Sequence, residues 1–260
     1  MIRLVATDLD GTLLHPNGEM PEGIFDCIRD RTSRGVRFAA ASGRPTGSVR
    51  KLFAPVADQI DFICENGALV IARGRQLATY FPRAMAEEII RDLREAGLEL
   101  FLSVPERCYG ITNASEAFLH ETVHRGFNIS FVDDPLPGAD GYIKITGFHL
   151  DAARVAPPIQ EKWRGKVHCD IAGEHWLDFT LASKGSGIRT LAEALEIPLS
   201  DAAAFGDQFN DLSMLEVVGH PYVMAHAPAP LLQMGFQRCE NVMDILQVIL
   251  RQANGDSTQY

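Results

Sequence analysis

The chain has 260 residues, of which 46% are hydrophobic, and a formal net charge of −10 at pH 7. This length can bury a sizeable core, and the acidic balance argues against a nucleic-acid partner because it repels a phosphate backbone. No window approaches the roughly eighteen apolar residues of a membrane helix, and the N-terminus lacks a secretory leader. Five scattered cysteines, none in a C-x-x-C arrangement, argue against disulfides and a cysteine zinc site. We therefore expect a cytoplasmic protein with no membrane partner, and the composition leaves its oligomeric state open.

Short apolar strands alternate with helices in the first third of the chain. Strands are predicted at residues 2–8, 36–42 and 61–67, with helices at 21–35 and near 46–54 between them. This order is typical of a parallel sheet that is covered by helices on both faces. Residues 68–80 then have the pattern of a hairpin that turns at Arg73 and Gly74.

The pattern changes to α+β order from Pro82 onward. Helices are predicted at 84–97, 114–126 and 151–163, and short strands at 98–104, 108–112, 128–132, 142–148, 166–172 and 175–181. Antiparallel pairing would join these strands, so residues 82–181 are interpreted as an inserted domain. The strand and helix alternation then resumes, with helices at 185–195 and 210–218 and strands at 201–207 and 221–225. Residues 1–81 and 182–260 are therefore predicted to form one core.

Polar residues follow the predicted core strands. They are Asp8 and Asp10; Ser42, Gly43 and Arg44; Lys184, just before a helix; and Asp207, Asn210 and Asp211. Ligands of open α/β sheets bind at the carboxyl ends of the strands, so these groups can converge although they are far apart in sequence.

Asp8 and Asp10 pose an electrostatic problem. Residues two apart in an extended segment begin on one face, and two close carboxylates repel unless a cation lies between them or the chain turns. Gly11 permits a turn. Hard oxygen ligands favour Mg²⁺, for which Asp207 is the second carboxylate. Lys184 and a serine hydroxyl would then supply the cation and the donor that a phosphoryl group requires.

Each of these pieces alone has an ordinary structural explanation. Asp10-Gly11 is a common turn pair, Ser42-Gly43 a loop, Lys184 a solvated lysine and residues 210–215 a capped helix start. Their joint order is much harder to obtain by accident. The segments "DLDGTLL", "AASGR", "SKGSGI" and "GDQFND" resemble the four motifs of the haloacid dehalogenase superfamily, in the family's order.

The inserted segment resembles the C2-type cap of the Cof-like branch, class IIB, and "CENGA" at residues 64–68 is similar to a stretch of that branch. The resemblance implies an α/β fold with a Rossmann-like, doubly wound parallel-sheet core and an inserted α+β cap. It also implies that Asp8 is the nucleophile and that Asp10 is the general acid and then the base. Asp8, the Asp10 backbone carbonyl and Asp207 would bind Mg²⁺.

The resemblance assigns the remaining motif residues to the phosphoryl group. Ser42, the Gly43 backbone and Lys184 would hold its oxygens, and Asn210 would touch it. Asp211 would support the metal ligands or orient Lys184.

One segment departs from the family. A Gly-Asn-Ala turn often follows the fourth motif, and here "VMAHAPAP" places Ala225 and His226 at that point. His226 either borders the pocket or has a structural role, and the second interpretation is favoured.

Three other patterns in the sequence have rival interpretations. "HETVH", from His120 to His124, matches the H-E-x-x-H of zinc peptidases, but it falls in the inserted domain and lacks the extended metzincin pattern. Lys184 precedes its glycines, unlike the lysine of a phosphate loop, and a glycosidase needs no lysine, serine or metal. A phosphomutase with a related cap and a non-catalytic protein that binds a phosphorylated metabolite remain as alternatives.

We therefore expect a Mg²⁺-dependent phosphatase whose partner is a small phosphorylated metabolite and whose cap selects the leaving group. Arg44 directly follows the phosphate-holding turn, so it is a candidate substrate contact. Four cap aromatic residues are candidates for the substrate site, with core packing expected for most: Tyr109, Phe127, Tyr142 and Trp176.

Overall fold

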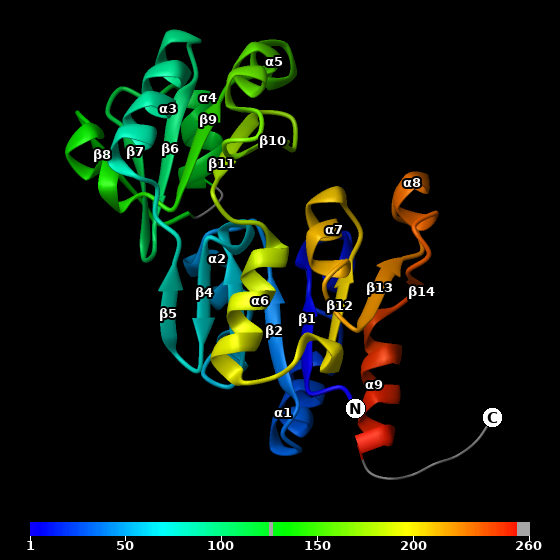
Figure 1. The fold of residues 1–260 in the computed structure, drawn as a ribbon. Coiled ribbons are helices and arrows are strands. Elements are labelled where there is room, and N and C mark those ends of the chain that lie inside the picture. The colour runs from blue at the N-terminus through cyan, green and yellow to red at the C-terminus, as the bar shows by residue number, and fades with distance from the viewer. Residues whose placement is uncertain (125–126, 254–260) are drawn as a thin grey trace. The chain divides into compact units, whose positions relative to one another are not determined.

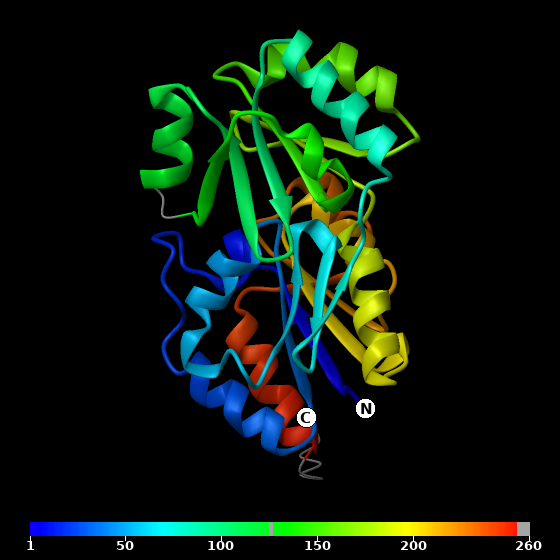
Figure 2. The same ribbon diagram turned by 90° about the vertical axis from the view of Figure 1, so that its left-hand side faces the viewer.

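The computed structural model describes residues 1–124 and 127–253 (Figures 1 and 2). The chain divides into two compact units. The core unit consists of Met1–Gly43, Val49–Leu77 and the chain from Ser183 onward, and the inserted unit consists of Ala78–Ala182 together with Arg44–Ser48. No helix in the described part of the chain is long and apolar enough to cross a membrane.

The core unit contains an eight-stranded sheet of order β14-β13-β12-β1-β2-β3-β4-β5. Its strands are β1 (Leu4–Thr7), β2 (Arg37–Ala41), β3 (Asp61–Cys64), β4 (Leu69–Ala72), β5 (Arg75–Ala78), β12 (Ala202–Gly206), β13 (His220–Met224) and β14 (Gln237–Cys239). The six strands from β14 to β3 pair in parallel, and β4 pairs with β3 in the antiparallel direction. This is the predicted α/β sheet, including the hairpin that turns at Arg73 and Gly74.

Helices cover both faces of the core sheet, as Figure 2 shows. They are α1 (Ile24–Ser33), α2 (Thr46–Leu52), α6 (Lys184–Leu195), α7 (Phe209–Leu215), α8 (Ala229–Leu232) and α9 (Val242–Ala253). Leu4 and Ala6 point to the face that packs on α6 and α7, whereas Phe38 packs on Phe53 at the other face, where α1 contacts α9. Side chains alternate along each strand, so both faces of the buried strands are apolar.

The sequence analysis assigned no element after residue 225. The structure adds α8, the three-residue strand β14 and α9 there. Val242, Leu246 and Ile249 are buried at i, i+4 and i+7, which is the spacing of an amphipathic helix. That signal was present in the sequence and was missed.

The inserted unit contains a six-stranded sheet of order β10-β11-β9-β6-β7-β8. Its elements are β6 (Glu99–Val104), β7 (Arg107–Ile111), β8 (Ile129–Val132), β9 (Lys144–Phe148), β10 (His168–Ala172), β11 (Trp176–Thr180), α3 (Arg83–Glu95), α4 (Glu116–Leu119) and α5 (Ala152–Trp163). All strand pairs are antiparallel, as expected, except β7 with β8, which run parallel. The predicted helix at 114–126 is α4 followed by a π-helical segment, His120–His124, and residues 125–126 lie outside the described part.

The four aromatic residues singled out in this unit pack against its hydrophobic clusters, and one of them is buried. Tyr142 is buried, and its hydroxyl donates to the Pro135 carbonyl at 2.7 Å. Tyr109 packs against the cluster that α3 and α5 form with the sheet, and Phe127 and Trp176 pack against the cluster on the opposite face. Packing within the unit therefore accounts for them without a ligand.

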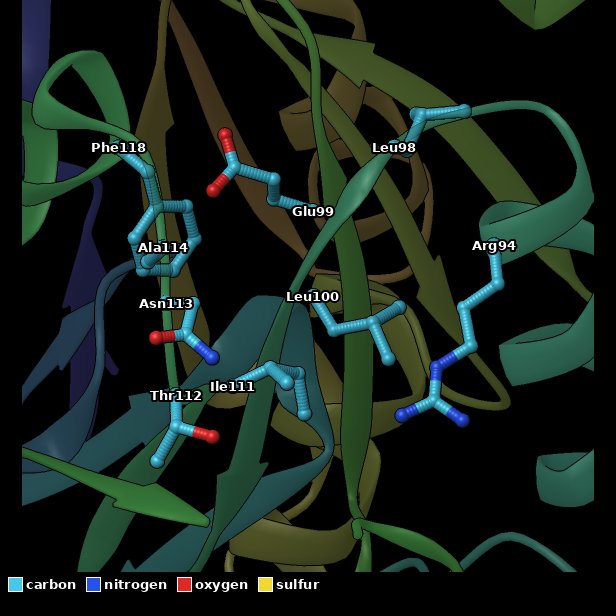
Figure 3. Close-up of a pocket in the computed structure, with 9 residues that line it drawn as sticks. All are labelled: Arg94, Leu98, Glu99, Leu100, Ile111, Thr112, Asn113, Ala114 and Phe118. Carbon is cyan, nitrogen blue, oxygen red and sulfur yellow. The ribbon is translucent and has the colours of Figure 1, made fainter. Parts of the chain in front are cut away.

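The inserted unit also contains a cavity of about 190 Å³ (Figure 3). The pairing of β6 with β7 ends at Leu102 and Tyr109. The cavity lies past this pair, where the two strands no longer pair with each other. Its lining residues are Arg94, Leu98, Glu99, Leu100, Ile111, Thr112, Asn113, Ala114 and Phe118. None of the site residues predicted from the sequence lines it.

Candidate active site

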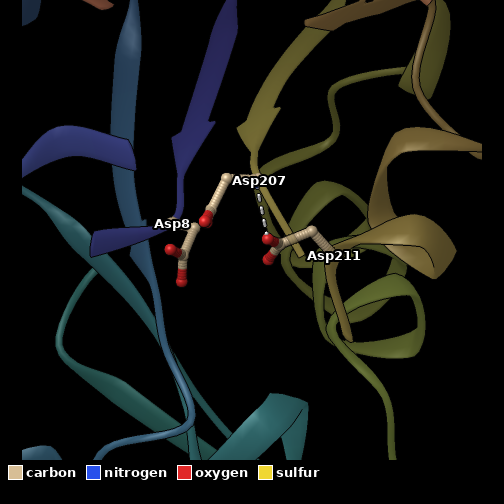
Figure 4. Close-up of side chains that lie close together, drawn as sticks. All are labelled: Asp8, Asp207 and Asp211. Atoms are coloured by element: carbon tan, nitrogen blue, oxygen red, sulfur yellow. Dashed lines mark hydrogen bonds between the residues drawn. The ribbon is translucent and has the colours of Figure 1, made fainter. Parts of the chain in front are cut away.

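Three carboxylates meet at the carboxyl ends of β1 and β12. Asp8 follows β1, Asp207 follows β12, and Asp211 lies one turn further on in α7. One ligand atom from each lies within 4.8 Å of the others, and all three residues are buried (Figure 4). The parallel pairing of β1 with β12 explains the meeting, because it brings the ends of two strands about two hundred residues apart to the same edge.

Lys184 supplies the positive charge of this cluster. It is the first residue of α6, which begins at a capping box formed by Ser183 and Ser186. Its Nζ donates to Asp8 Oδ1 at 2.5 Å and to Asp211 Oδ1 at 2.6 Å. Burial alone would lower the pKa of Lys184, but the two carboxylates outweigh it and raise that pKa above its usual value. Lys184 is therefore a fixed ammonium ion, not a solvated surface lysine.

Asp211 is held from two sides. Its Oδ1 accepts from Lys184, and its Oδ2 accepts from the backbone N–H groups of Asp207 and Gln208, each at 3.0 Å. Gly206 allows this close approach, because a Cβ there would lie 2.4 Å from the Asp211 Cβ. These bonds suit a residue that orients Lys184 and the turn of Asp207, although Asp211 also lies within the carboxylate cluster.

The buried carboxylates fit a divalent cation. Burial raises the pKa of Asp8 to about 7, although the nearby Lys184 charge opposes that shift. Burial also raises the pKa of Asp207, whose oxygens accept from Thr12 Oγ1 at 3.0 Å and Gln208 Nε2 at 3.1 Å. One buried lysine is thus set against three carboxylates with hard oxygen atoms. A Mg²⁺ ion would complete the charge balance there.

Asp10 lies apart from the cluster. Residues Leu9–Leu13 form a π-helical turn in which Asp10 and Gly11 depart from helical dihedral angles, so Asp8 and Asp10 do not share the face of one strand. Asp8 is buried, whereas Asp10 is exposed. Of the two ways of avoiding their repulsion that the sequence allows, the structure shows the turn, because the chain leaves the extended conformation immediately after β1.

Gly11 makes this turn possible. Its φ is 82°, and a Cβ there would lie 2.5 Å from Asp207 Oδ2. Thr12, the residue after Gly11, donates its hydroxyl hydrogen to Asp207 Oδ1. The turn after β1 therefore packs closely against Asp207 at the end of β12.

Ser42 and Gly43 end the neighbouring strand β2. The buried Ser42 donates its backbone N–H to the Ile63 carbonyl at 2.8 Å and accepts from the Asn66 N–H at 3.1 Å. A Cβ on Gly43 would lie 2.9 Å from Asn66 Oδ1, an atom that is buried without a hydrogen-bond partner among the described residues. Asn66, in "CENGA", therefore supports the Ser42 turn.

The other predicted residues lie less centrally. Arg44 groups with the inserted unit, and Asn210, the second residue of α7, is exposed. His226 Nε2 lies 2.7 Å from the Gly11 carbonyl oxygen. Sequence reasoning left this residue with two interpretations, and it gave Thr12 and Gln208 no role. In the segments "DGT" and "GDQ", Thr12 and Gln208 lie close to predicted site residues. This closeness in sequence is the only feature that could have pointed to their contacts with Asp207.

The zinc-peptidase pattern has no comparable geometry. His120 and Glu121 lie in a π-helical segment, and His120 Nδ1 lies 3.3 Å from Glu121 Oε1. The side chain of His124 falls outside the described part of the chain. Within that part, the one group of three or more His, Cys, Asp or Glu side chains with metal-binding spacing is Asp8, Asp207 and Asp211.

Comparison with known proteins places this arrangement in a family. The chain is 24% identical to the 5-amino-6-(5-phospho-D-ribitylamino)uracil phosphatase YbjI of Escherichia coli, over 96% of this chain and 97% of that one. It is 26% identical to the HMP-PP phosphatase of Citrobacter koseri, over 89% of this chain and 87% of that protein. A crystal structure from Eubacterium rectale, 26% identical, superimposes with a TM-score of 0.86 and covers 95% of this chain and 99% of its own. A family profile described as haloacid dehalogenase-like hydrolase matches residues 5–235, so this chain belongs to the haloacid dehalogenase-like hydrolases, as its four motifs predicted.

Proposed function

We propose that this protein is a Mg²⁺-dependent phosphatase that hydrolyses a small phosphorylated metabolite through an aspartyl-phosphate on Asp8. The observation that carries the proposal is the buried contact of Asp8 with Lys184, within the cluster that Asp8 forms with Asp207 and Asp211. A nucleophilic carboxylate needs a nearby cation that draws in an anionic phosphoryl group, and Lys184 is in place for that purpose.

Asp8, Asp207 and the Asp10 backbone carbonyl would hold Mg²⁺, and Asp211 would support that site through its bonds to Lys184 and to the turn of Asp207. The ion supplies charge neutralisation between the carboxylate and the phosphoryl oxygens, which would otherwise repel. The raised pKa values of Asp8 and Asp207 support this assignment. Burial makes their negative charges costly, and a bound cation would offset that cost.

The side chains would then divide the chemistry into two steps. Asp8 attacks phosphorus, the bond from phosphorus to the leaving oxygen breaks, and Asp10 gives that oxygen a proton. Water then attacks phosphorus, Asp10 takes a proton from it, and the bond to Asp8 breaks to release phosphate. Asp10 is exposed and can exchange protons with solvent or substrate, whereas the buried Asp8 keeps a fixed position.

The phosphoryl oxygens would be held by Ser42, the Gly43 N–H and Lys184, with Asn210 as a further contact. Ser42 and Lys184 are both buried, so their polar groups are fixed before substrate arrives. Fixed donors stabilise a transition state without reorganisation.

We assign the choice of leaving group to residues 82–181, the cap of the Cof-like branch, and the chemistry to residues 1–81 and 182–260. The separate hydrophobic core of the inserted unit supports this division, since a unit that packs on its own sheet can vary in sequence without disturbing the strands of the core unit. Arg44 directly follows the Ser42–Gly43 turn and is proposed as a further substrate contact.

The names of the relatives support a small phosphorylated substrate. YbjI acts on a phosphorylated ribitylaminouracil, and the Citrobacter koseri protein on HMP-PP. The two substrates differ chemically, yet the two proteins are about equally similar to this chain. The proposal therefore names phosphorylated metabolites as a class and no single substrate.

The test is phosphate release from a metabolite panel of sugar phosphates, pyridoxal phosphate, flavin mononucleotide and HMP-PP, with Mg²⁺ and with a chelator. Wild type should release phosphate only with Mg²⁺, and Asp8→Asn should release none. Full activity of that variant would refute the mechanism. Isomerised sugar phosphate without free phosphate would favour a phosphomutase, and silence on every substrate would favour a binding protein.

A further inference from the structure

His226 lies in the loop between β13 and α8, and this loop is fixed on both sides of it. The backbone N–H of Ala225 donates to the Cys239 carbonyl at 2.9 Å, and that of Ala227 donates to the Met224 carbonyl at 3.0 Å. His226 Nε2 lies 2.7 Å from the carbonyl oxygen of Gly11, a residue 215 positions away in sequence. Nε2 must carry its hydrogen in this contact, because a carbonyl oxygen can only accept.

The Gly11 peptide is the point at which this bond can affect the site. Gly11 follows Asp10 directly and has φ of 82°, and Thr12 donates to Asp207 Oδ1 at 3.0 Å. The turn is thus held through the Thr12 hydroxyl on one side and through the Gly11 carbonyl on the other. The Gly11 carbonyl belongs to the amide that joins Gly11 to Thr12, so His226 holds the peptide that directly precedes the Thr12 side chain and directly follows the peptide carrying the Asp10 carbonyl.

We propose that His226 is a positioning residue that fixes the Asp10–Gly11 turn relative to Asp207. The inference rests on the proposed function, and it extends that function by a residue that no motif assigns. The bond holds the Asp10 backbone carbonyl where it can serve as a cation ligand, and it gives the Asp10 side chain a fixed base from which to reach the leaving oxygen. His226 itself touches neither substrate nor the reacting atoms.

A purely structural bond would predict a different pattern of effects. His226 is exposed, so its removal leaves no cavity and little buried apolar area is lost. Its effect on metal-free stability should therefore be small. Its effect on cation affinity and on kcat should be larger, because both depend on where the turn sits.

The experiment compares His226→Ala, His226→Gln and the control His220→Ala. A glutamine amide can donate from nearly the same place as Nε2. His220 is the half-buried first residue of β13. Each protein is titrated with MgCl₂ by calorimetry, melted without metal, and assayed for kcat and KM of phosphate release.

We expect His226→Ala to weaken Mg²⁺ binding and to lower kcat about five- to tenfold each, the size of one lost hydrogen bond. KM and the metal-free melting temperature should stay near wild type. His226→Gln should recover most of both losses, and His220→Ala should show neither.

The proposal would be overturned if His226→Ala kept the Mg²⁺ affinity and kcat of the wild type. It would also be overturned if His226→Gln failed to recover the losses seen in His226→Ala. The Mg²⁺ titration needs no turnover. If the wild type releases no phosphate from any substrate, the proposed function fails while the titration still decides the role of His226.

Discussion

Lys184 and Asp211 form a buried ion pair of 2.6 Å, and the same ammonium group contacts Asp8 at 2.5 Å. The pair joins the start of α6 to α7, which are neighbours in the core unit. One lysine therefore holds Asp8, the proposed nucleophile, and Asp211, which binds the turn of Asp207, in a single network.

Replacement of Lys184 by methionine should destabilise the protein and abolish phosphate release. The change leaves Asp8 and Asp211 buried without their cation, and loss of one partner of a buried pair costs about 3–5 kcal/mol. Urea unfolding without metal at neutral pH measures the effect. Lys51→Met, at an exposed lysine of α2, is the control and should change stability by less than about 0.5 kcal/mol. Near wild-type stability of Lys184→Met would contradict the network.

The stability of the metal-free protein should fall as pH rises through neutrality. Burial raises the pKa of Asp8 to about 7, so the folded state retains a proton that the unfolded chain has already lost. The resulting stabilisation is complete below about pH 4 and is lost as pH rises through about 7. Asp207, whose pKa burial also raises, acts in the same direction.

Mg²⁺ should reverse this trend, because it competes with the proton for the same carboxylates. The increase in melting temperature on adding MgCl₂ should therefore grow from pH 5.5 to pH 8. Melting curves across this range test it, with Asp8→Asn as the comparison, in which the pH dependence should be much weaker. A metal effect that is equal at both ends of the range would count against Asp8 as a ligand.

Gly11→Ala and Gly18→Ala form a matched pair. Their φ values are 82° and 81°, so both alanines pay the same cost of a left-handed backbone, about 1–2 kcal/mol. Only the Gly11 Cβ meets another atom, at 2.5 Å from Asp207 Oδ2, whereas nothing lies within 4 Å of a Cβ at Gly18. Gly11→Ala should therefore lose more stability and should also weaken Mg²⁺ binding. Equal losses in urea unfolding would show that the contact with Asp207 does not matter.

Asp10→Asn should separate binding from turnover. The side chain is exposed and outside the carboxylate cluster, so folding and Mg²⁺ affinity should stay near wild type. The amide cannot donate and recover an acidic proton, so kcat should fall by about 10²–10⁴. Calorimetry and phosphate release provide the two readouts, and a strong loss of Mg²⁺ affinity would assign the Asp10 side chain to the metal instead.

The sequence predicted most of the core because its strands carry unbroken apolar runs between helices. The order of β1, β2 and β3 with α1 and α2 follows from that alternation, and so does the hairpin at Arg73 and Gly74. The parallel pairing of β7 with β8 could not be foreseen, because strand direction in the inserted unit depends on how α4 returns the chain and not on a local pattern.

Site prediction depended on the sheet edge. Asp8 and Asp207 were expected to converge because they follow core strands, and Lys184 because it begins a helix of the same core, and the structure brings them together. The contacts of His226 and Asn66 join loops that are distant in sequence, and no periodicity or spacing marks such pairs. The opposite exposure of Asp8 and Asp10 follows from the π-helical turn, whose dihedral angles the motif does not specify.

The order of these elements along the chain has a consequence for synthesis. Asp8 leaves the ribosome early, but Lys184 and the strand β12 that pairs with β1 come only after the inserted unit. Until then β1 lacks one neighbour and Asp8 lacks its counter-ion, whereas Ala78–Ala182 is a continuous stretch with its own core. We expect the inserted unit to fold first on the ribosome and the core sheet to close late, in a step dominated by non-local contacts.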